Sequence, residues 1–317
     1  MPPIRIGISS CLLGNKVRYD GGHKHDRYLT DTLGKYFEWV PVCPEVELGL
    51  GVPRETIQLV QAQGEQQVRL MTSRTELDLT RRMRTLVSRR ATALAKEDLS
   101  GFVLKSKSPS CGTERVKVHQ AKGPPKKSGQ GFFVKALLQR LPNLPVEEEG
   151  RLCDPRLREN WVERVFACHA MKGLWASRWS IGDLVRFHTV YKFVLLAHSP
   201  ADYRALGRLV AEAKSIPRRE LRSRYEADFM AALKRLATPR KHTNVLQHMV
   251  GFFKKELDTD ARHELLAHIE DYRQGLVPLV VPLTLIRHYK RILHIPYLED
   301  QIYLNPHPKE LSLRNHV

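Results

Sequence analysis

Apolar and polar positions alternate with a different period in each half of this chain. In the first half, short apolar runs rich in β-branched and aromatic residues predict strands at residues 4–9, 38–42 and 102–105. Between the last two runs, apolar residues at three- and four-residue spacing predict an amphipathic helix, with Gly101 as its stop. The apolar positions of this helix are Leu79, Met83, Leu86, Val87, Ala91 and Leu94. Strands alternating with a helix indicate an α/β, Rossmann-like domain with a mainly parallel sheet.

The rest of the chain carries other patterns. Residues 119–131 are rich in Gly, Pro and Lys, which predicts a loop. Residues 155–293 show helical spacing almost throughout, so we expect an all-α carboxy-terminal domain and a division into residues 1–148 and 149–317. Prolines should separate its helices at Ser199-Pro200, Ile216-Pro217, Thr238-Pro239 and Val277-Pro278. Residues 295–317 contain three prolines and are expected to be extended and to wrap around this domain.

The charge of the chain suggests a class of partner. Lys and Arg number 52 against 34 acidic residues, which gives a formal net charge of +18 and a pI near 9.8. Residues 1–150 carry 24 basic and 16 acidic side chains, and residues 151–317 carry 28 and 18. An excess in both halves indicates a broad surface for a polyanion such as RNA, although ordinary solubility charge would also produce it. The candidate contacts are Lys126, Lys127, Arg218, Arg219 and Arg222.

Other features of the sequence indicate a cytoplasmic protein without membrane attachment. No apolar run approaches the length of a membrane-spanning helix, and the first residues lack the long apolar region of a signal peptide. Five cysteines are an odd number, which argues against a disulfide framework and for metal, catalytic or buried thiols. Cys153 and Cys168 show no ligand spacing, so we expect both to pack as small apolar side chains.

The other three cysteines each follow a predicted strand. Cys11, Cys43 and Cys111 come at or just after the strand ends, and the carboxyl ends of parallel strands share the edge where open α/β sheets bind ligands. We therefore expect the three thiols to converge. A structural zinc site is disfavoured because the chain has no C-x-x-C pair. A 4Fe-4S cluster usually takes four thiolates, so three would leave one iron open as a soft Lewis acid suited to sulfur.

Polar residues beside the thiols add acid–base and hydrogen-bonding groups. Glu45 lies two residues after Cys43 and is either a general acid or base or an ordinary surface carboxylate. Three serines precede Cys111, namely Ser106, Ser108 and Ser110. Their hydroxyls either bond to a cluster or substrate or only shape a turn. Arg18 and Asp20 either line the crevice or are solvated.

Four motifs resemble those of a known family. The stretches "SSCLLG", "RYDG", "VCPE" and "LKSKSPSCG" occur in this order within residues 4–145, and together they resemble the thiouracil desulfidase (TudS) family. The remainder ends in "YLEDQIYLNPHPKELSLRN" and is similar to an all-helical companion domain often fused to that family. The combination resembles proteins proposed to remove sulfur from 4-thiouridine in tRNA.

The resemblance implies a ligand set and a reaction. Cys11, Cys43 and Cys111 would each ligate one iron of a 4Fe-4S cluster, and the fourth iron would take the thiocarbonyl sulfur. Glu45 would act as the acid or base, assisted by a serine, with Ser106 preferred. The residues expected to bind substrate are Ser108, Ser110, Arg18 and Asp20. The implied reaction converts 4-thiouridine in tRNA to uridine by hydrolysis, with release of sulfide and without external electrons.

Two other interpretations stay open at this point. The first is the same chemistry on free thiouracil or a thionucleoside, with the helical domain in an accessory role. The second is an RNA-binding protein whose cluster senses oxidants or holds structure. The segment "GVPRETIQ" departs from the more proline-rich version of the family, so no role is assigned to Arg54. The sequence indicates no oligomeric state.

Overall fold

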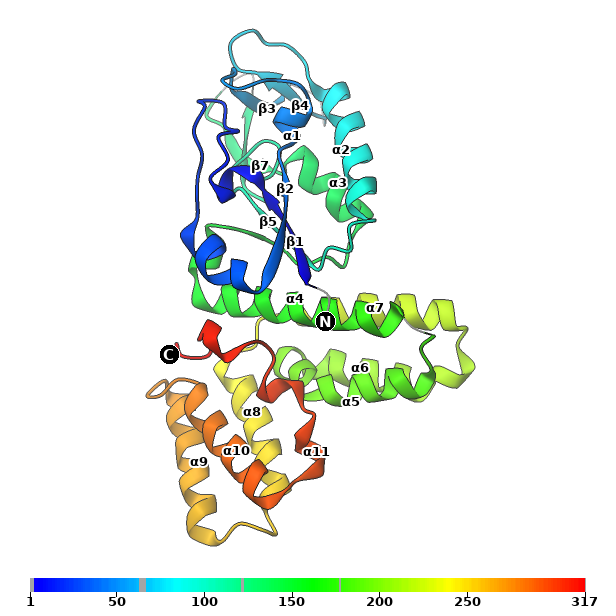
Figure 1. The fold of residues 1–317 in the computed structure, drawn as a ribbon, viewed down its shortest axis with the longest axis vertical. Helices are drawn as coiled ribbons and strands as arrows, with labels where there is room; N and C mark the ends of the chain where they lie inside the picture. The colour runs from blue at the N-terminus through cyan, green and yellow to red at the C-terminus, as the bar shows by residue number, and fades with distance from the viewer. Residues whose placement is uncertain (1–2, 63–66, 121–122, 177, 317) are drawn as a thin grey trace. The chain divides into compact units, whose positions relative to one another are not determined.

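The computed structural model divides the chain into two compact units, residues 1–153 and 154–317. It describes residues 3–62, 67–120, 123–176 and 178–316. All its strands belong to the first unit, and the second unit is helical (Figure 1). This arrangement confirms the predicted fold class, an α/β domain followed by an all-α domain.

A four-stranded parallel sheet forms the centre of the α/β unit. Its strands are β1 (Ile4–Ser9), β2 (Phe37–Val42), β5 (Gly101–Leu104) and β8 (Val146–Glu148), in the order β2-β1-β5-β8. The three predicted strands are therefore neighbours. Gly7 pairs with Phe102, and a Cβ at Gly7 would lie 2.2 Å from the Phe102 ring, so glycine lets that ring pack against β1.

A second sheet with mixed pairing was not predicted. Its order is β4-β3-β6-β7, formed by β3 (Ile57–Gln61), β4 (Val68–Thr72), β6 (Val116–Gln120) and β7 (Lys126–Gly129). The loop predicted at residues 119–131 is therefore wrong in part, because β6 and β7 pair antiparallel there. Residues 121 and 122 lie outside the described ranges. Strand β7 lies at the edge of this sheet with its lysines exposed, a common way to protect an edge strand from further pairing.

Three helices accompany these sheets, namely α1 (Pro44–Glu47), α2 (Thr80–Leu94) and α3 (Phe132–Arg140). Helix α2 is the predicted amphipathic helix, and its buried positions are Met83, Leu86, Val87, Ala91 and Leu94. It ends at Leu94, so Gly101 is not its stop but the first residue of β5. Helices α2 and α3 lie side by side (Figure 1) and close one apolar core with the strands.

The helical unit contains eight α-helices within the described ranges. They are α4 (Pro155–Ala176), α5 (Ile181–His198), α6 (Pro200–Ala211), α7 (Arg218–Leu233), α8 (Pro239–Val250), α9 (Thr259–Gln274), α10 (Val280–Leu293) and α11 (Pro296–Glu299). Two predicted breaks are helix starts, because Ser199 and Thr238 cap α6 and α8 with their hydroxyls and a proline follows each cap. No described helix is long and apolar enough to span a bilayer.

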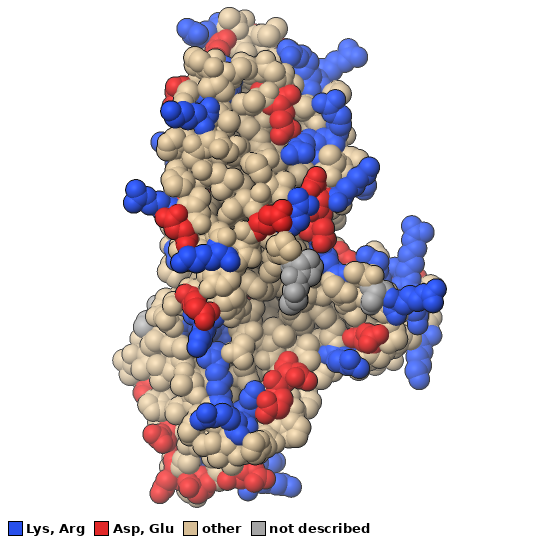
Figure 2. Space-filling model, in the orientation of Figure 1, with Lys and Arg blue, Asp and Glu red and all other residues tan. Residues whose placement is uncertain are grey.

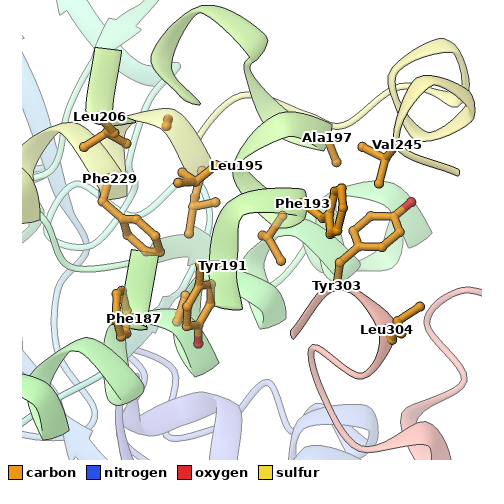
Figure 3. Packing of buried hydrophobic residues seen from close by; sticks show 14 of the residues in the cluster. Phe187, Tyr191, Phe193, Leu195, Ala197, Leu206, Phe229, Val245, Tyr303 and Leu304 are labelled. Carbon is orange, nitrogen blue, oxygen red and sulfur yellow. The ribbon is translucent and has the colours of Figure 1, made fainter. Parts of the chain in front are cut away.

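Aromatic side chains fill the core of the helical unit. Phe187 stacks on Tyr191 with ring centroids 4.6 Å apart, and Tyr225 stacks on Phe229 at 5.8 Å. Figure 3 shows part of this cluster, in which Tyr303 and Leu304 of the carboxy-terminal tail lie beside residues of the helices.

The carboxy-terminal tail is not extended as predicted. It forms α11 and short helical turns, because its apolar residues alternate with turn residues and are buried in the core. Arg314 lies near its end, 5% exposed, and donates hydrogen bonds to Glu159 at 3.0 Å and Glu163 at 2.8 Å on α4. The tail is therefore held to its unit by a buried ion pair as well as by apolar contacts.

Candidate active site

The carboxyl ends of three adjacent strands position three cysteines. Cys11 lies in a tight turn directly after β1, Cys43 directly follows β2 and precedes α1, and Cys111 lies in the loop after β5. Because the strands are ordered β2-β1-β5, the three thiols come from neighbouring positions on one sheet edge. This is the convergence that the sequence predicted.

One cavity of about 340 Å³ joins these cysteines. Its lining includes Cys11, Cys43 and Cys111 together with Glu45, Ser106, Ser108 and Arg18, all of them predicted site residues. A volume of this size, walled by both apolar and hydrogen-bonding groups, is typical of a small-molecule site.

Burial disfavours the ionised form of all three thiols. It raises the pKa of Cys11 to about 11, with Cys43 adding to the rise. The pKa of Cys111 rises further, through burial and then through the nearby Glu45 carboxylate, and burial also raises the pKa of Cys43. Three thiolates gathered in one cavity therefore need a compensating positive charge, which metal ligation provides.

The donor set suits a cluster better than a single ion. Across the described ranges, no three or more His, Cys, Asp or Glu side chains are arranged to hold one metal ion. A 4Fe-4S cluster presents a different iron to each thiolate, so its ligands surround a volume instead of meeting at a point. Three soft thiols around a shared cavity fit this requirement, and the chain offers no fourth cysteine there.

Two residues hold Glu45 in the cavity wall. Arg54 contacts Glu45 Oε2 through Nη2, while its Nη1 donates to the carbonyl oxygens of Val17 and Gly51, both at 3.0 Å. On the other side, Ser110 Oγ donates to Glu45 Oε1 at 3.2 Å. Glu45 is thus a fixed carboxylate within the site, and Arg54, which the sequence left without a role, is its ionic partner.

The loop that carries Cys111 is anchored on α3. Gly131 N and Phe133 N donate to the carbonyl oxygens of Gly112 at 2.8 Å and Ser110 at 2.9 Å. A Cβ at Gly131 would lie 2.4 Å from the Ser110 carbonyl oxygen, so only glycine allows this approach. Ser110 itself is fully buried and lies behind Glu45 instead of lining the cavity, although it was expected to contact substrate.

Ser106 lies in a hydrogen-bonded group that sequence reasoning missed. Its hydroxyl and amide donate to the carboxylate of Glu149 at 2.9 Å and 2.7 Å, and Lys105 Nζ donates to its hydroxyl at 2.9 Å. Lys105 and Glu149 also form an ion pair. No pattern in the sequence indicated strand β8, which brings these residues together: Leu104, the last residue of β5, pairs with Glu148, the last residue of β8. Lys105 and Glu149 directly follow these two residues.

Of the other two residues predicted to contact substrate, one lines the cavity and the other does not. Arg18 lines the cavity, and its guanidinium lies 5.2 Å from the Tyr19 ring centroid. Asp20 does not line it, since its side chain is 49% exposed and accepts from Gly22 N at 3.0 Å within its own turn. Its 3.6 Å contact with Arg18 makes it a neighbour of the site.

A second cavity shares one wall with the first. The residues common to both are Tyr19, Thr56, Ile57, Lys107 and Pro109. The second cavity is also lined by Arg115, Lys117, His119, Lys127 and Arg151, with Glu114 and Glu148 as its acidic members. We call this second cavity the basic groove. Of the two predicted loop lysines, Lys127 lines the basic groove. Lys126, the preceding residue on β7, is exposed and is not part of its lining.

The predicted arginines of the helical unit lie on the first turns of α7. Arg218 donates to the Trp179 carbonyl oxygen at 3.0 Å and its guanidinium lies 5.4 Å from that ring centroid. Arg222 lies 5.5 Å from the Trp175 ring centroid. Arg218, Arg219 and Arg222 are all exposed, but two of them also pack on tryptophans. Figure 2 shows Lys and Arg spread over both units on one face, with acidic residues among them.

The remaining cysteines differ from each other. Cys168 is buried in the helical core as expected. Cys153 is exposed at the end of the α/β unit, so the expectation that it packs in a core is wrong. The apolar neighbour that faces inward in its turn is Leu152, which is buried.

Comparisons with known proteins follow the same division of the chain. Residues 6–149 match the family profile described as 2-thiouracil desulfurase, and residues 192–308 match the profile described as a protein of unknown function, DUF1722. Among solved structures, the 4Fe-4S-dependent thiouracil desulfidase TudS is 30% identical, with 47% of this chain and 93% of that chain covered and a TM-score of 0.39.

Two curated relatives are uncharacterized proteins. The chain is 35% identical over 161 residues to YbgA of Escherichia coli (strain K12), which covers 50% of this chain and 95% of YbgA. It is 32% identical over 117 residues to YbbK of Bacillus subtilis (strain 168), which covers 34% of this chain and 73% of YbbK. The chain therefore belongs to the families of YbgA and of YbbK, with a 2-thiouracil desulfurase domain at residues 6–149 and a DUF1722 domain at residues 192–308.

Proposed function

We propose that this protein is a 4Fe-4S-dependent desulfidase that replaces the sulfur of a thiolated uracil ring by oxygen. The observation that carries the proposal is one cavity, within the 2-thiouracil desulfurase domain, lined by three thiols, two buried and one half-buried, and by a fixed carboxylate. Cys11, Cys43 and Cys111 are the proposed ligands of the cluster. When bound, a cluster with one iron free of protein ligands supplies a soft Lewis-acid position for a thiocarbonyl sulfur.

The residues of the chain supply the proton chemistry. Glu45, held by Arg54 and Ser110, takes a proton from the water that adds to the ring carbon. It returns that proton as the carbon–sulfur bond breaks and the sulfur leaves as hydrogen sulfide. One water is consumed, its oxygen stays on the ring and both of its hydrogens leave with the sulfur. The reaction balances without an oxidant or reductant.

The substrate that we propose is 4-thiouridine in tRNA, with free thiouracil or a thionucleoside as the alternative. The basic groove supports the larger substrate, because it continues from the cavity and carries Lys107, Arg115, Lys117 and Lys127. Phosphates next to a bound base would lie among these cations. The formal charge of +18 is consistent with a polyanionic partner, and a cytoplasmic location is part of the proposal.

The test compares two substrates under anaerobic conditions. The full chain with its cluster is mixed with 4-thiouridine-containing tRNA or with free 4-thiouracil, and the loss of thiocarbonyl absorbance is followed. Faster turnover of tRNA at equal concentration supports the tRNA substrate, and turnover of 4-thiouracil alone supports the alternative. If neither substrate loses sulfur while the cluster is intact, the proposed activity is wrong.

A further inference from the structure

The hydroxyl hydrogen of Ser106 has a fixed direction. Lys105 Nζ is a donor only, so at 2.9 Å the Ser106 oxygen must accept from it. The Glu149 carboxylate is an acceptor, so at 2.9 Å the Ser106 hydroxyl must donate to it. A hydroxyl has one hydrogen and two lone pairs, and this pairing uses the hydrogen and one lone pair. What Ser106 has left for the cavity is one lone pair, which makes it a hydrogen-bond acceptor.

Lys105 is committed to this arrangement. Its three ammonium hydrogens meet three acceptors, namely Glu149 Oε1, Ser106 Oγ and, at 3.3 Å, the Ser106 carbonyl oxygen. Glu149 is likewise engaged at both oxygens, since Oε2 accepts from Ser106 N at 2.7 Å. Lys105 and Glu149 are therefore positioning residues that act through Ser106.

Ser108 has the opposite pattern. Its hydroxyl oxygen accepts from the backbone N–H groups of Ser110 and Cys111, both at 3.2 Å. These two bonds use both lone pairs and leave the hydroxyl hydrogen free to be donated. Ser106 and Ser108 line the same cavity, so one loop presents an acceptor and a donor to whatever binds there.

We propose that these two serines read the edge of the pyrimidine ring, with Ser106 accepting from the ring N3–H and Ser108 donating to the O2 carbonyl. This inference rests on the proposed function for the identity of the ring. In 4-thiouracil the edge runs from the O2 acceptor through the N3–H donor to the sulfur, so an acceptor and a donor on the protein match the two positions beside the reacting group. The substrate class is a thiocarbonyl heterocycle with an unsubstituted ring N–H next to the C=S group.

The test measures binding as well as turnover. Titration calorimetry of the cluster-loaded full chain compares uracil, the proposed product, with 3-methyluracil, which lacks the N3–H, and with pyrimidin-4-one, which lacks O2. Leaving a buried hydrogen-bonding group unpaired weakens binding by about 10- to 100-fold. We expect both analogues to bind more weakly than uracil by about that factor.

Two variants assign the loss to the serines. In Ser106→Ala, uracil and 3-methyluracil should bind about equally, while pyrimidin-4-one still binds more weakly than uracil. In Ser108→Ala the result should reverse: uracil and pyrimidin-4-one should bind about equally, while uracil still binds more tightly than 3-methyluracil. Each variant is thus the control for the other, and loss of fold would remove both preferences together.

The positioning residues need a separate readout. Lys105→Met removes the donor that occupies one lone pair of Ser106, and Glu149→Gln replaces the acceptor by an amide that can donate. Glu149→Gln frees the Ser106 hydroxyl to rotate, so discrimination between uracil and 3-methyluracil should fall toward that of Ser106→Ala. Lys105→Met leaves the Glu149 acceptor of the Ser106 hydrogen in place, so this variant should keep most of that discrimination. Discrimination against pyrimidin-4-one should be retained, which a general loss of structure would not allow.

The outcomes separate this inference from the proposed function. Equal binding of uracil and 3-methyluracil to the unaltered protein overturns the inference, whether or not 4-thiouracil is turned over. Preferential binding of uracil, with no turnover of 4-thiouracil, supports the ring-edge contacts and removes the proposed desulfidase activity. The turnover of 3-methyl-4-thiouracil should be at least about 10-fold below that of 4-thiouracil, and this difference should disappear in Ser106→Ala. That result supports both the ring-edge contacts and the proposed desulfidase activity.

Discussion

The guanidinium of Arg54 is paired with the carboxylate of Glu45 in the wall of the cavity, and their side chains are only 4% and 18% exposed. An ion pair this shielded fixes the direction of the carboxylate, and Ser110 fixes its other oxygen. Arg54→Leu should therefore lower the turnover of 4-thiouracil by about 10- to 100-fold, because a misplaced base loses its geometry. The cluster absorbance should be kept, since Arg54 is not a proposed ligand.

A double-variant comparison checks that Arg54 acts through Glu45. Glu45→Gln alone should lower turnover by about 100-fold or more. Once Glu45 is replaced, the further change Arg54→Leu should have little additional effect, since residues that act as a unit are not additive. If the two losses multiply instead, Arg54 contributes by another route.

The proposed cluster ligands lead to a second prediction. Cys11→Ala, Cys43→Ala and Cys111→Ala should each lose the brown chromophore and most of the bound iron and sulfide in anaerobically prepared protein, because each removes a thiolate from the cavity that the three share. Cys168→Ala and Cys153→Ala are matched controls outside that cavity and should keep both. A full cluster in Cys111→Ala would remove that residue from the ligand set.

Sequence reasoning found the strands that carry these cysteines for a physical reason. Strands β1 and β5 are central in a parallel sheet, where both faces are covered and the sequence reads as a nearly continuous apolar run. Strands such as β3, with Gln58 and Gln61, are only half buried and leave a weaker signal. The second sheet was therefore missed, and with it the wall of the basic groove.

The partners of the site residues were also beyond sequence reasoning. Cys43 and Glu45 were found because they adjoin in the chain, whereas Arg54 reaches Glu45 across a turn. Glu149 reaches Ser106 only through the pairing of β5 with the three-residue strand β8. Pairing between short strands depends on the whole fold, so no local pattern could indicate it.

Buried histidines give the helical unit a pH dependence. His242 is 7% exposed and bonded to Tyr303, and burial lowers its pKa from 6.5 to about 3. Burial also lowers the pKa of His188 and of His307 to about 4. Between these values and pH 6.5 the three histidines bind more protons in the unfolded chain than in the folded one, so the stability that they contribute is present above pH 6.5 and is lost as the pH falls.

Hydrogen exchange in helix α8 measures this effect without interference from the cluster. Protection of its amides should fall as the pH is lowered from about 7 toward about 4, after correction for the intrinsic exchange rate. His242→Gln should make that fall shallower, because the number of protons taken up on unfolding, which sets the slope of the unfolding free energy against pH, decreases by up to about one. An unchanged slope in this variant would show that His242 is not among the groups that titrate on unfolding.

The basic groove leads to the last prediction. Lys117 and Lys127 line the basic groove but not the cavity that holds the three cysteines. Reversing both charges therefore tests tRNA binding by the groove without changing the lining of that cavity. In Lys117→Glu/Lys127→Glu, the ratio of tRNA turnover to 4-thiouracil turnover should fall by about 10-fold or more at low salt. The salt dependence of tRNA binding should also flatten, because binding through fewer phosphate contacts releases fewer counterions.

The arginines of α7 provide the comparison that decides where the polyanion binds. Arg219→Glu is the cleaner probe there, because Arg218 and Arg222 also pack on tryptophans and their replacement would disturb the helical core. A loss of tRNA turnover in Arg219→Glu but not in the groove double variant would place the tRNA contact on α7 instead. If both variants keep the tRNA turnover and its salt slope, neither surface grips tRNA, and free thiouracil or a thionucleoside becomes the better substrate.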